Sequence, residues 1–384
     1  MKTRLSKSRL LAILMVLGLI AAACGSSSDT ASDGGGDEGG GGGDAAECET
    51  VDDVTLQLQW FAQAQFAGYY AALDQGIYES RCLNVTILEG GVDIVPQQVL
   101  ASGGADYAIS WVPRVLASIE EGIDVVNVAQ VFQRSGTLQV SFADSGITSP
   151  EDFAGANIGS WGFGNEFELL AGSRSAGLEP GEDFEIVQQN FDMLALINGE
   201  IDAAQAMIYN EYAQVLETVN PETGELFTAD DLTIIDWNDV GTAMLQDAIW
   251  ASGERLSDGA YQDQTTRFIA ASLEGWAWCR DNGDACVDTV LNNGTTLGES
   301  HQAWQLNEVN ALIWPSPGGA GVMDADLWQQ TVDVSVAEGV LTGEPADGVF
   351  TTEFSEAALD LLDGVDTVGD GFERIEVTLN EGGE

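Results

Sequence analysis

The chain has 384 residues, and its 63 aspartates and glutamates outnumber its 12 lysines and arginines, which leaves a formal net charge of −51. Nucleic acids and anionic lipid surfaces are recognised by cationic faces, so this balance excludes both as expected partners. The acids are spread along the chain, which indicates a solvated acidic surface rather than one acidic tail.

The N-terminal segment 1–23 has the order of a secretory signal peptide. A basic stretch precedes an apolar run over 10–22, which is too short to span a membrane. Cys24 follows where such a peptide is cut and resembles the lipid-modified cysteine of bacterial lipoproteins, although Ala21 stands where leucine is commoner. The sequence therefore predicts export and lipidation of Cys24. The alternative is a cut nearby, with Cys24 incidental.

The segment 24–47 is rich in glycine, serine and acids and has no apolar residue larger than alanine after Cys24. Such a composition buries too little surface to order itself, so we expect a flexible tether. With the lipid anchor, it predicts a protein held at the outer face of the cytoplasmic membrane.

Four further cysteines, Cys48, Cys82, Cys279 and Cys286, are an even number in a chain expected to be exported, which favours disulfides. Three pairings are possible. We expect Cys48–Cys82 and Cys279–Cys286, because a turn-prone segment separates the latter two. A metal site is disfavoured, because His301 is the one histidine and no close Cys-x-x-Cys occurs.

The first part of the remaining chain alternates strand-like and helix-like patterns, as expected for an α/β fold with mostly parallel sheets. Strands are expected over 54–58, 85–88, 107–109 and 124–131, and helices over 66–78, 96–101 and 115–121.

A second alternation begins near Ser149, a candidate N-cap before Pro150. Strands are expected over 156–160, 185–189 and 203–208, helices over 166–176 and 193–198, and then a strand over 248–251 and a helix over 261–279. We expect two α/β lobes joined by a two-strand hinge, the first from 48–140 with 248–350 and the second from 141–247. Residues 351–384 are expected to form an acidic C-terminal extension.

Residues 56–78 read LQLQWFAQAQFAGYYAALDQGIY, and GIYESRCLNV follows over 76–85. These stretches, with SPEDFAG at 149–155 and LINGEIDAA at 196–204, resemble ABC-transporter substrate-binding proteins of the group related to thiamine-pyrimidine synthase. That group also holds the alkylsulfonate-, taurine- and nitrate-binding proteins. The resemblance implies a type II periplasmic-binding-protein fold, a monomer, a ligand between the lobes and delivery to a membrane permease.

The candidate ligand-binding residues lie at or near predicted strand ends. They are Trp60, Gln63, Gln65, Tyr69, Ser110, Trp111, Trp161, Gly162, Asn165, Glu166, Tyr209, Asn210, Glu211, Trp237 and Asp239. Aromatic walls with a few amides and acids suit a flat, mostly neutral heterocycle, such as a thiamine-precursor pyrimidine or riboflavin. Each tryptophan could instead fill the core. Residues 160–166 could be a tight turn without a ligand, and Asn210 could simply cap a helix.

Anionic ligands are the alternative within the group, with Arg114, Arg134 and Arg174 as candidate contacts. They are disfavoured, because no lysine follows Lys7 and eight arginines follow Arg9.

An enzyme is the rival class. The synthases of the group hold pyridoxal phosphate on a lysine, and this chain offers none after Lys7. His301 alone also leaves no spare base for a nucleophile triad. We therefore expect no catalysis and no cofactor. A carboxylate-pair hydrolase and a surface protein without a ligand are the remaining alternatives.

Overall fold

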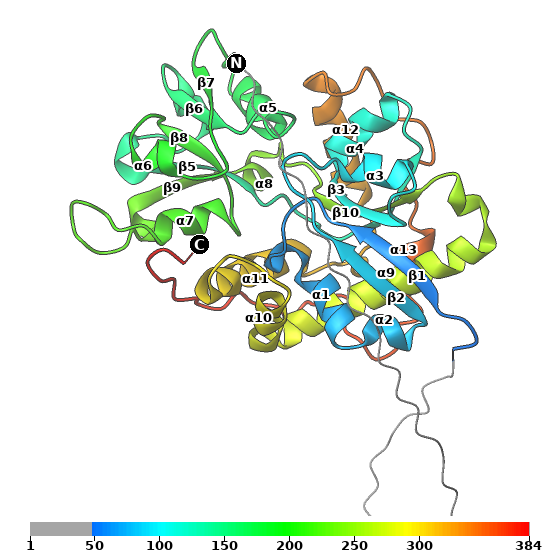
Figure 1. The fold of residues 1–384 in the computed structure, drawn as a ribbon. Helices are drawn as coiled ribbons and strands as arrows, with labels where there is room; N and C mark the ends of the chain where they lie inside the picture. The colour runs from blue at the N-terminus through cyan, green and yellow to red at the C-terminus, as the bar shows by residue number, and fades with distance from the viewer. Residues whose placement is uncertain (1–47, 384) are drawn as a thin grey trace, which may run out of the picture. The chain divides into compact units, whose positions relative to one another are not determined.

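A computed structural model describes residues 48–383; the expected signal peptide, Cys24 and the whole of the expected tether over 24–47 lie outside the described residues. Two five-stranded sheets organise the described chain, with strand orders β2-β1-β3-β10-β4 and β7-β6-β8-β5-β9. They confirm the expected two-lobe α/β architecture, and Figure 1 shows each sheet with its own helices.

The strands of the first sheet are β1 (Asp52–Gln57), β2 (Leu83–Leu88), β3 (Tyr107–Trp111), β4 (Val125–Gln130) and β10 (Asp247–Ser252). Those of the second are β5 (Thr137–Phe142), β6 (Asn157–Ser160), β7 (Glu185–Gln188), β8 (Ala203–Met207) and β9 (Leu232–Asp236). The strands β10 and β5 run antiparallel to both of their neighbours, and all other neighbouring strands in the two sheets pair in parallel. Each antiparallel strand is the first one after the chain crosses from the other sheet.

The helices of the first half are α1 (Ala67–Asp74), α2 (Ile77–Ser80), α3 (Pro96–Ala101), α4 (Val112–Glu120), α5 (Phe167–Ser175), α6 (Leu194–Ile197) and α7 (Glu211–Leu216). The second half adds α8 (Trp237–Val240), α9 (Gly259–Asp281), α10 (Gly283–Asn292), α11 (Glu299–Ile313), α12 (Ala325–Ala337) and α13 (Glu353–Leu359). Short 3-10 turns include η1 (Ala64–Phe66) and η3 (Pro150–Phe153), and Ser149 caps the latter as expected.

Helices cover both faces of the first sheet because its strands alternate their apolar side chains. Tyr107 and Ile109 pack with α1 and α9, whereas Ala108 between them packs with α3, α4 and α12. Successive residues of a strand point to opposite faces, so one apolar run supplies both layers. In the second lobe, α6 and α7 cover one face and α5 the other.

The helix expected over 66–78 is two helices. The chain turns at Gly76, whose φ of 70° lies in the left-handed region, and α2 starts at the next residue. Glycine adopts this conformation without the steric penalty of a Cβ, so the helical pattern breaks here.

Two segments join the lobes, 131–136 between β4 and β5 and 237–246 between β9 and β10. Asn238 ties them together: its Oδ1 accepts from the Ser135 N–H at 3.1 Å and its Nδ2 donates to the Ser135 carbonyl at 2.8 Å. The side chain of Gln246 adds bonds to Ser135, Gly136 and Thr137. The two crossings therefore form one hydrogen-bonded unit.

Both expected disulfides are present, Cys48–Cys82 beside β2 and Cys279–Cys286 between α9 and α10. The C-terminal residues 351–383 do not stand apart from the lobes. In α13, Phe354 and Ala358 are buried in the same cluster as α9. Further along, the Gly383 carbonyl accepts from the Gly298 N–H.

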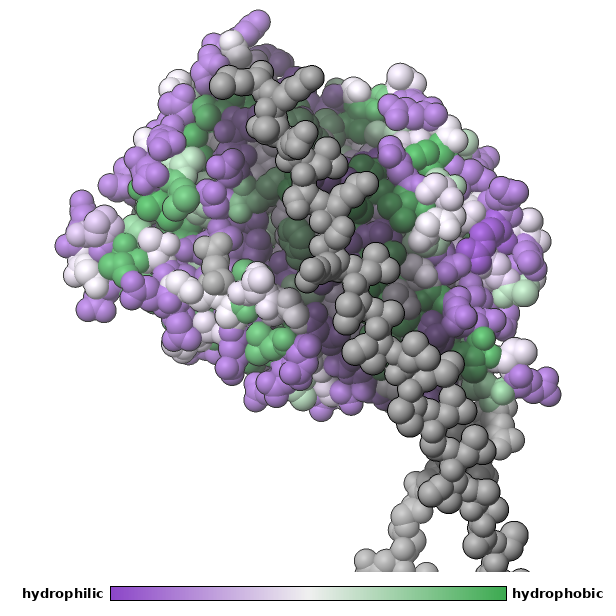
Figure 2. All heavy atoms as spheres, viewed as in Figure 1, coloured by the Kyte–Doolittle hydropathy of each residue, from purple (hydrophilic) through white to green (hydrophobic). Residues whose placement is uncertain are grey.

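The visible surface of the described residues is mostly hydrophilic (Figure 2). Figure 2 shows hydrophilic side chains spread over the visible face, with apolar ones scattered among them. Within residues 48–383, no helix is long and apolar enough to cross a bilayer, and no cluster of His, Cys, Asp and Glu could hold a metal ion.

Candidate ligand-binding cleft

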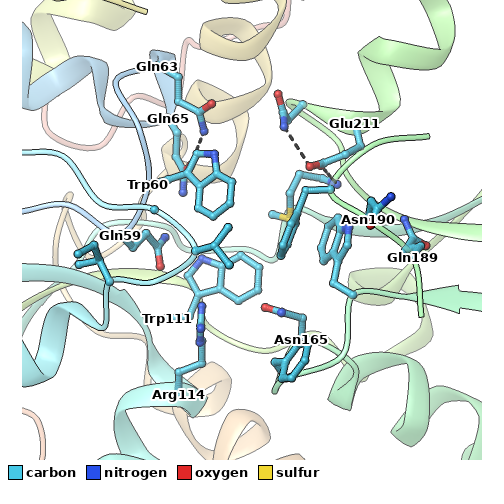
Figure 3. Close-up of a pocket in the computed structure, with 18 of the residues that line it drawn as sticks. Gln59, Trp60, Gln63, Gln65, Trp111, Arg114, Asn165, Gln189, Asn190 and Glu211 are labelled. Atoms are coloured by element: carbon cyan, nitrogen blue, oxygen red, sulfur yellow. Dashed lines mark hydrogen bonds between the residues drawn. The ribbon is translucent and has the colours of Figure 1, made fainter. Parts of the chain in front are cut away.

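A cavity of about 510 Å³ is lined by residues of both lobes. Its walls come from the loops that follow β1, β2 and β3 in the first sheet and β6, β7 and β8 in the second. These strands are parallel within each sheet, so their carboxyl ends and the following loops gather at one edge. Figure 3 shows the side chains converging from the two sides; we call this cavity the main cleft.

The wall from the first lobe carries Trp60 and Trp111 with three glutamines. Gln63 and Gln65 are each 4% exposed, and the Gln63 Nε2 donates to the Gln65 Oε1 at 2.7 Å. Amides with both donors and acceptors beside two indole rings can hold a flat polar ring by stacking and by in-plane hydrogen bonds.

Asp247, at the first position of β10, holds three side chains of this wall by hydrogen bonds. It is 1% exposed, and it accepts from Gln59 Nε2 at 2.6 Å, Trp111 Nε1 at 2.8 Å and Gln65 Nε2 at 3.0 Å. Burial raises the pKa of Asp247 to about 7, although the three donors act in the opposite direction. One carboxyl thus fixes three side chains of the main cleft.

The wall from the second lobe is aromatic at its centre. The rings of Trp161 and Phe191 stack with centroids 5.6 Å apart, and Phe191 meets Trp60 of the first lobe at 5.3 Å. Phe191 is 43% exposed. An exposed aromatic residue that contacts a ring of the other lobe is suited to enclosing a planar ligand.

Glu211 is the acidic group of the main cleft. It is 4% exposed, and its two oxygens accept from the Met207 N–H at 2.9 Å and from Asn210 Nδ2 at 3.0 Å. Burial raises the pKa of Glu211, and these hydrogen bonds and the nearby His301 lower it. Its remaining acceptor capacity suits an exocyclic amine or a ring N–H.

A buried chain of polar groups continues from Glu211 to α11. The Asn210 Oδ1 lies 2.9 Å from His301 Nε2, and His301 Nδ1 lies 3.0 Å from a Glu217 oxygen. His301 is fully buried. The histidine therefore acts as a structural bridge between α11 and the second lobe.

Residues 160–166 form a tight turn at the edge of the main cleft. Gly162, Phe163 and Gly164 all have positive φ, which is unusual for the phenylalanine at 55°. The Gln205 Oε1 holds the start of the turn by accepting from Ser160 Oγ and the Trp161 N–H. Phe163 is left 81% exposed and lines the cavity.

Arg114, from α4, lines the main cleft, at the end opposite Glu211 in Figure 3. No carboxylate among residues 48–383 pairs with it. The other two candidate arginines lie elsewhere. Arg134 donates to main-chain carbonyls such as that of Pro315, and Arg174 pairs with Glu179 and Glu338.

Many of the expected binding residues meet at this cavity. Trp60, Gln63, Gln65, Trp111, Trp161, Asn165, Tyr209, Asn210 and Glu211 all line the main cleft. They share one property, a place at or shortly after the carboxyl end of a parallel strand.

Other expected residues do not line the main cleft. Tyr69 packs on Trp276 in the core, with ring centroids 5.8 Å apart, and Ser110 is buried and bonds Gln97. Trp237 is fully buried in the second lobe. Gly162 and Glu166 belong to the turn over 160–166 without lining the cavity, and the Glu166 carboxylate accepts from the Gly164 N–H. Asp239 lines a different cavity.

Sequence reasoning missed several lining residues. They are Gln59, Gly91, Val92, Ile94, Pro96, Phe163, Gln188, Gln189, Asn190, Phe191 and Met207. A signal was available for Asn190 and Phe191, because this amide and this aromatic residue directly follow the strand expected over 185–189. The sequence offers no such signal for Val92 or Ile94.

The two lobes, their strand orders and the cleft at the carboxyl ends of the strands define a type II periplasmic-binding-protein fold. A putative periplasmic sulfonate-binding protein of an ABC transporter from Methylobacillus flagellatus KT has the same fold. It superposes with a TM-score of 0.58 at 17% identity, over 83% of this chain and 97% of that one.

The chain belongs to the NMT1/THI5-like family, whose model matches residues 63–285. A formylaminopyrimidine-binding protein of Halalkalibacterium halodurans is 24% identical over 297 residues, 75% of this chain and 86% of the relative. A riboflavin-binding protein, RibY, of Chloroflexus aurantiacus is 26% identical over 323 residues, 79% of this chain and 86% of the relative.

Proposed function

We propose that this chain is the extracytoplasmic solute-binding protein of an ABC importer and that it captures a small, mostly neutral aromatic heterocycle. The ligand binds between the lobes, the lobes close about the two crossings, and the closed form delivers the ligand to the permease. Lipidation of Cys24, outside the described residues, would hold the protein at the outer face of the cytoplasmic membrane as a monomer.

The observation that carries this proposal is the buried Glu211 carboxylate beside the aromatic walls of the main cleft. Trp60, Trp161 and Phe191 offer faces for stacking, and Glu211 accepts from a donor at the ring edge. A pyrimidine or a flavin presents both features. The relatives that bind formylaminopyrimidine and riboflavin support the same class of ligand.

A sulfonate, taurine or nitrate is the second candidate, and the unpaired Arg114 is the feature that favours it. One cation faces Glu211 across the same cavity. A fully anionic ligand would meet a carboxylate there, so we rank it second. Arg114 suits a ring carbonyl equally well.

An enzyme of the same family is the other class to test. The absence of lysine after Lys7 removes the residue on which pyridoxal phosphate forms its Schiff base. The broadly matching relatives named above are binding proteins by description, which supports capture rather than turnover.

The test is a ligand screen read by melting temperature and tryptophan fluorescence. A ligand that binds the folded state stabilises it by about 2.7 kcal/mol at 100 times its dissociation constant. We expect riboflavin or an aminopyrimidine to raise the melting temperature, with taurine, alkylsulfonates and nitrate inactive. Stabilisation by anions alone would replace the heterocycle with the second candidate.

The variant Glu211→Gln tests the role of the Glu211 carboxylate in ligand binding. We expect about a 10- to 100-fold loss of heterocycle affinity, because a charged acceptor is replaced by a neutral amide. The exposed Glu182→Gln should bind as the unmodified protein does. Equal affinities for all three would remove Glu211 from the site, and conversion of the ligand to a product would identify an enzyme.

A further inference from the structure

A second cavity, of about 360 Å³, adjoins the main cleft. Trp60, Gln63, Phe191, Asn210 and Glu211 line both cavities, so the two share a wall. The second cavity extends past that wall to the loop between α10 and α11. We call it the side chamber.

The partition between the two cavities includes one aromatic residue from each lobe. Trp60 and Phe191 meet there with centroids 5.3 Å apart and ring planes inclined by 54°. Phe191 is 43% exposed. Rotation of such a ring about its side-chain torsions would open a passage without moving a strand.

Gln214 lies at the wall of the side chamber. It lies on α7, lines the chamber and is 8% exposed. Its Oε1 is buried and accepts no hydrogen bond from any residue in 48–383. Buried polar atoms in folded proteins nearly always have a partner, and a hydroxyl that reaches this wall of the chamber would supply one.

The charges of the residues that line the side chamber indicate which kind of ligand group it can hold. Glu89 and Glu211 line it, and no arginine or lysine does. Thr295 and Thr296, which carry hydroxyl groups, also line it. A phosphate or carboxylate would be repelled by the two glutamates, whereas hydroxyl groups can donate to them and to Gln214.

We propose that the ligand is a planar heteroaromatic ring with an uncharged, hydroxyl-rich substituent, the ring in the main cleft and the substituent in the side chamber. This assignment rests on the proposed solute-binding function and specifies its ligand class. It separates a polyol-bearing flavin from a bare pyrimidine, and the free compound from its phosphate ester.

Three flavins with the same ring system test the proposal by direct titration of the purified protein. Riboflavin carries a neutral polyol chain, lumiflavin carries a methyl group in its place, and flavin mononucleotide carries a phosphate on the polyol. We expect riboflavin to bind at least about tenfold more tightly than either of the others. Lumiflavin lacks the chain that would contact the side chamber, and the phosphate of flavin mononucleotide would be repelled by its glutamates.

Gln214→Met removes the acceptor at similar side-chain volume. We expect it to weaken riboflavin about five- to fiftyfold and to leave lumiflavin unchanged. The exposed Gln75→Met should change neither affinity. Thr296→Val, at an exposed position with little risk to folding, should weaken riboflavin and spare lumiflavin if Gln214→Met fails to fold.

The outcomes separate this proposal from the proposed function. Equal affinity for riboflavin and lumiflavin, or binding of an aminopyrimidine without riboflavin, overturns the side-chamber assignment and leaves the solute-binding role intact. Preferred binding of flavin mononucleotide overturns the argument from charge. Failure to bind any heterocycle overturns both.

Discussion

The side chain of Asp247 illustrates how one buried group controls the main cleft. Its carboxyl lies outside the cavity lining, yet the three side chains that donate to it, Gln59, Gln65 and Trp111, all line the cavity. Such a group positions others and touches no ligand itself. Burial removes the Asp247 carboxyl from water and so disfavours its charged form, which raises its pKa to about 7.

This raised pKa predicts a pH dependence that Asp247→Asn removes. The ordinary pKa is 3.8, so between about pH 4 and pH 7 the folded state keeps a proton that the unfolded chain has lost. The contribution of Asp247 to stability is therefore complete below pH 4 and is lost as the pH rises through about 7. A shift of roughly three units corresponds to about 4 kcal/mol at most.

Urea unfolding of both proteins between pH 4 and pH 8 measures this effect. We expect the free energy of unfolding of the unmodified protein to fall relative to that of Asp247→Asn over this range. Glu168, whose pKa burial also raises to about 7, titrates in both proteins and cancels in the difference. Parallel curves would show that Asp247 does not titrate there.

At the scale of elements, α1 and α9 pack closely because glycines lie at their contact. A Cβ on Gly275 would collide with the carbonyl oxygen of Gly68, and a Cβ on Gly68 would enter the ring of Trp276. The helix α1 directly follows η1, which contains Gln65 and is preceded by Gln63. The closeness of this helix pair therefore helps to position one wall of the main cleft.

Gly275→Ala should lower the free energy of unfolding by about 1–3 kcal/mol, because the backbone oxygen of the partner helix cannot move aside easily. Gly283→Ala, at the start of α10 with nothing within 4 Å of an added Cβ, is the matched control. It should leave stability equal or up to about 1 kcal/mol higher. Thermal melts of both variants measure this difference. Equal melting temperatures would mean that α1 and α9 can move apart with little loss of stability.

Two strands of the second sheet, β5 and β9, were not expected from the sequence, because their local pattern does not indicate a strand. In β5, Leu138 and Val140 face one cluster, but Gln139 and Ser141 on the other side are also buried and bond to main-chain carbonyls. Polar alternation is typical of a half-exposed strand rather than a central one. At the edge strand β9, Ile234 is 42% exposed, which blurs the alternation further.

At the scale of the whole molecule, α11 links the lobes in addition to the two crossings. It follows the return to the first sheet, yet Trp304 Nε1 donates to the Ile208 carbonyl of the second lobe at 2.9 Å. His301 and Glu217 form a buried pair close by. Closure must therefore either carry α11 with the second lobe or repack these contacts.

Solution scattering measures closure directly. A ligand that binds both walls should reduce the radius of gyration, because it favours the conformation in which both walls contact it. Glu211→Gln at the same ligand concentration should keep the value of the free protein. An unchanged radius for a saturated unmodified protein would show that the ligand binds without closure.

The sequence by itself determined most of the alternation of strands and helices, the two lobes and the positions of Trp60, Trp111 and Trp161 at or after strand ends. These features follow from local periodicity and from the order of residues after each strand. The disulfide between Cys279 and Cys286 was also accessible, because a short turn separates the two residues.

Only the tertiary structure decided which side chains face the main cleft. Tyr69 follows the lining residues Gln63 and Gln65 closely, and Trp237 directly follows a strand, but the layers that pack on their elements enclose both side chains. Asp247, Phe191 and Gln214 acquire their roles from partners or neighbours far away in the chain. The direction of a side chain depends on which surface covers its element, and that covering is set by long-range packing rather than by local pattern.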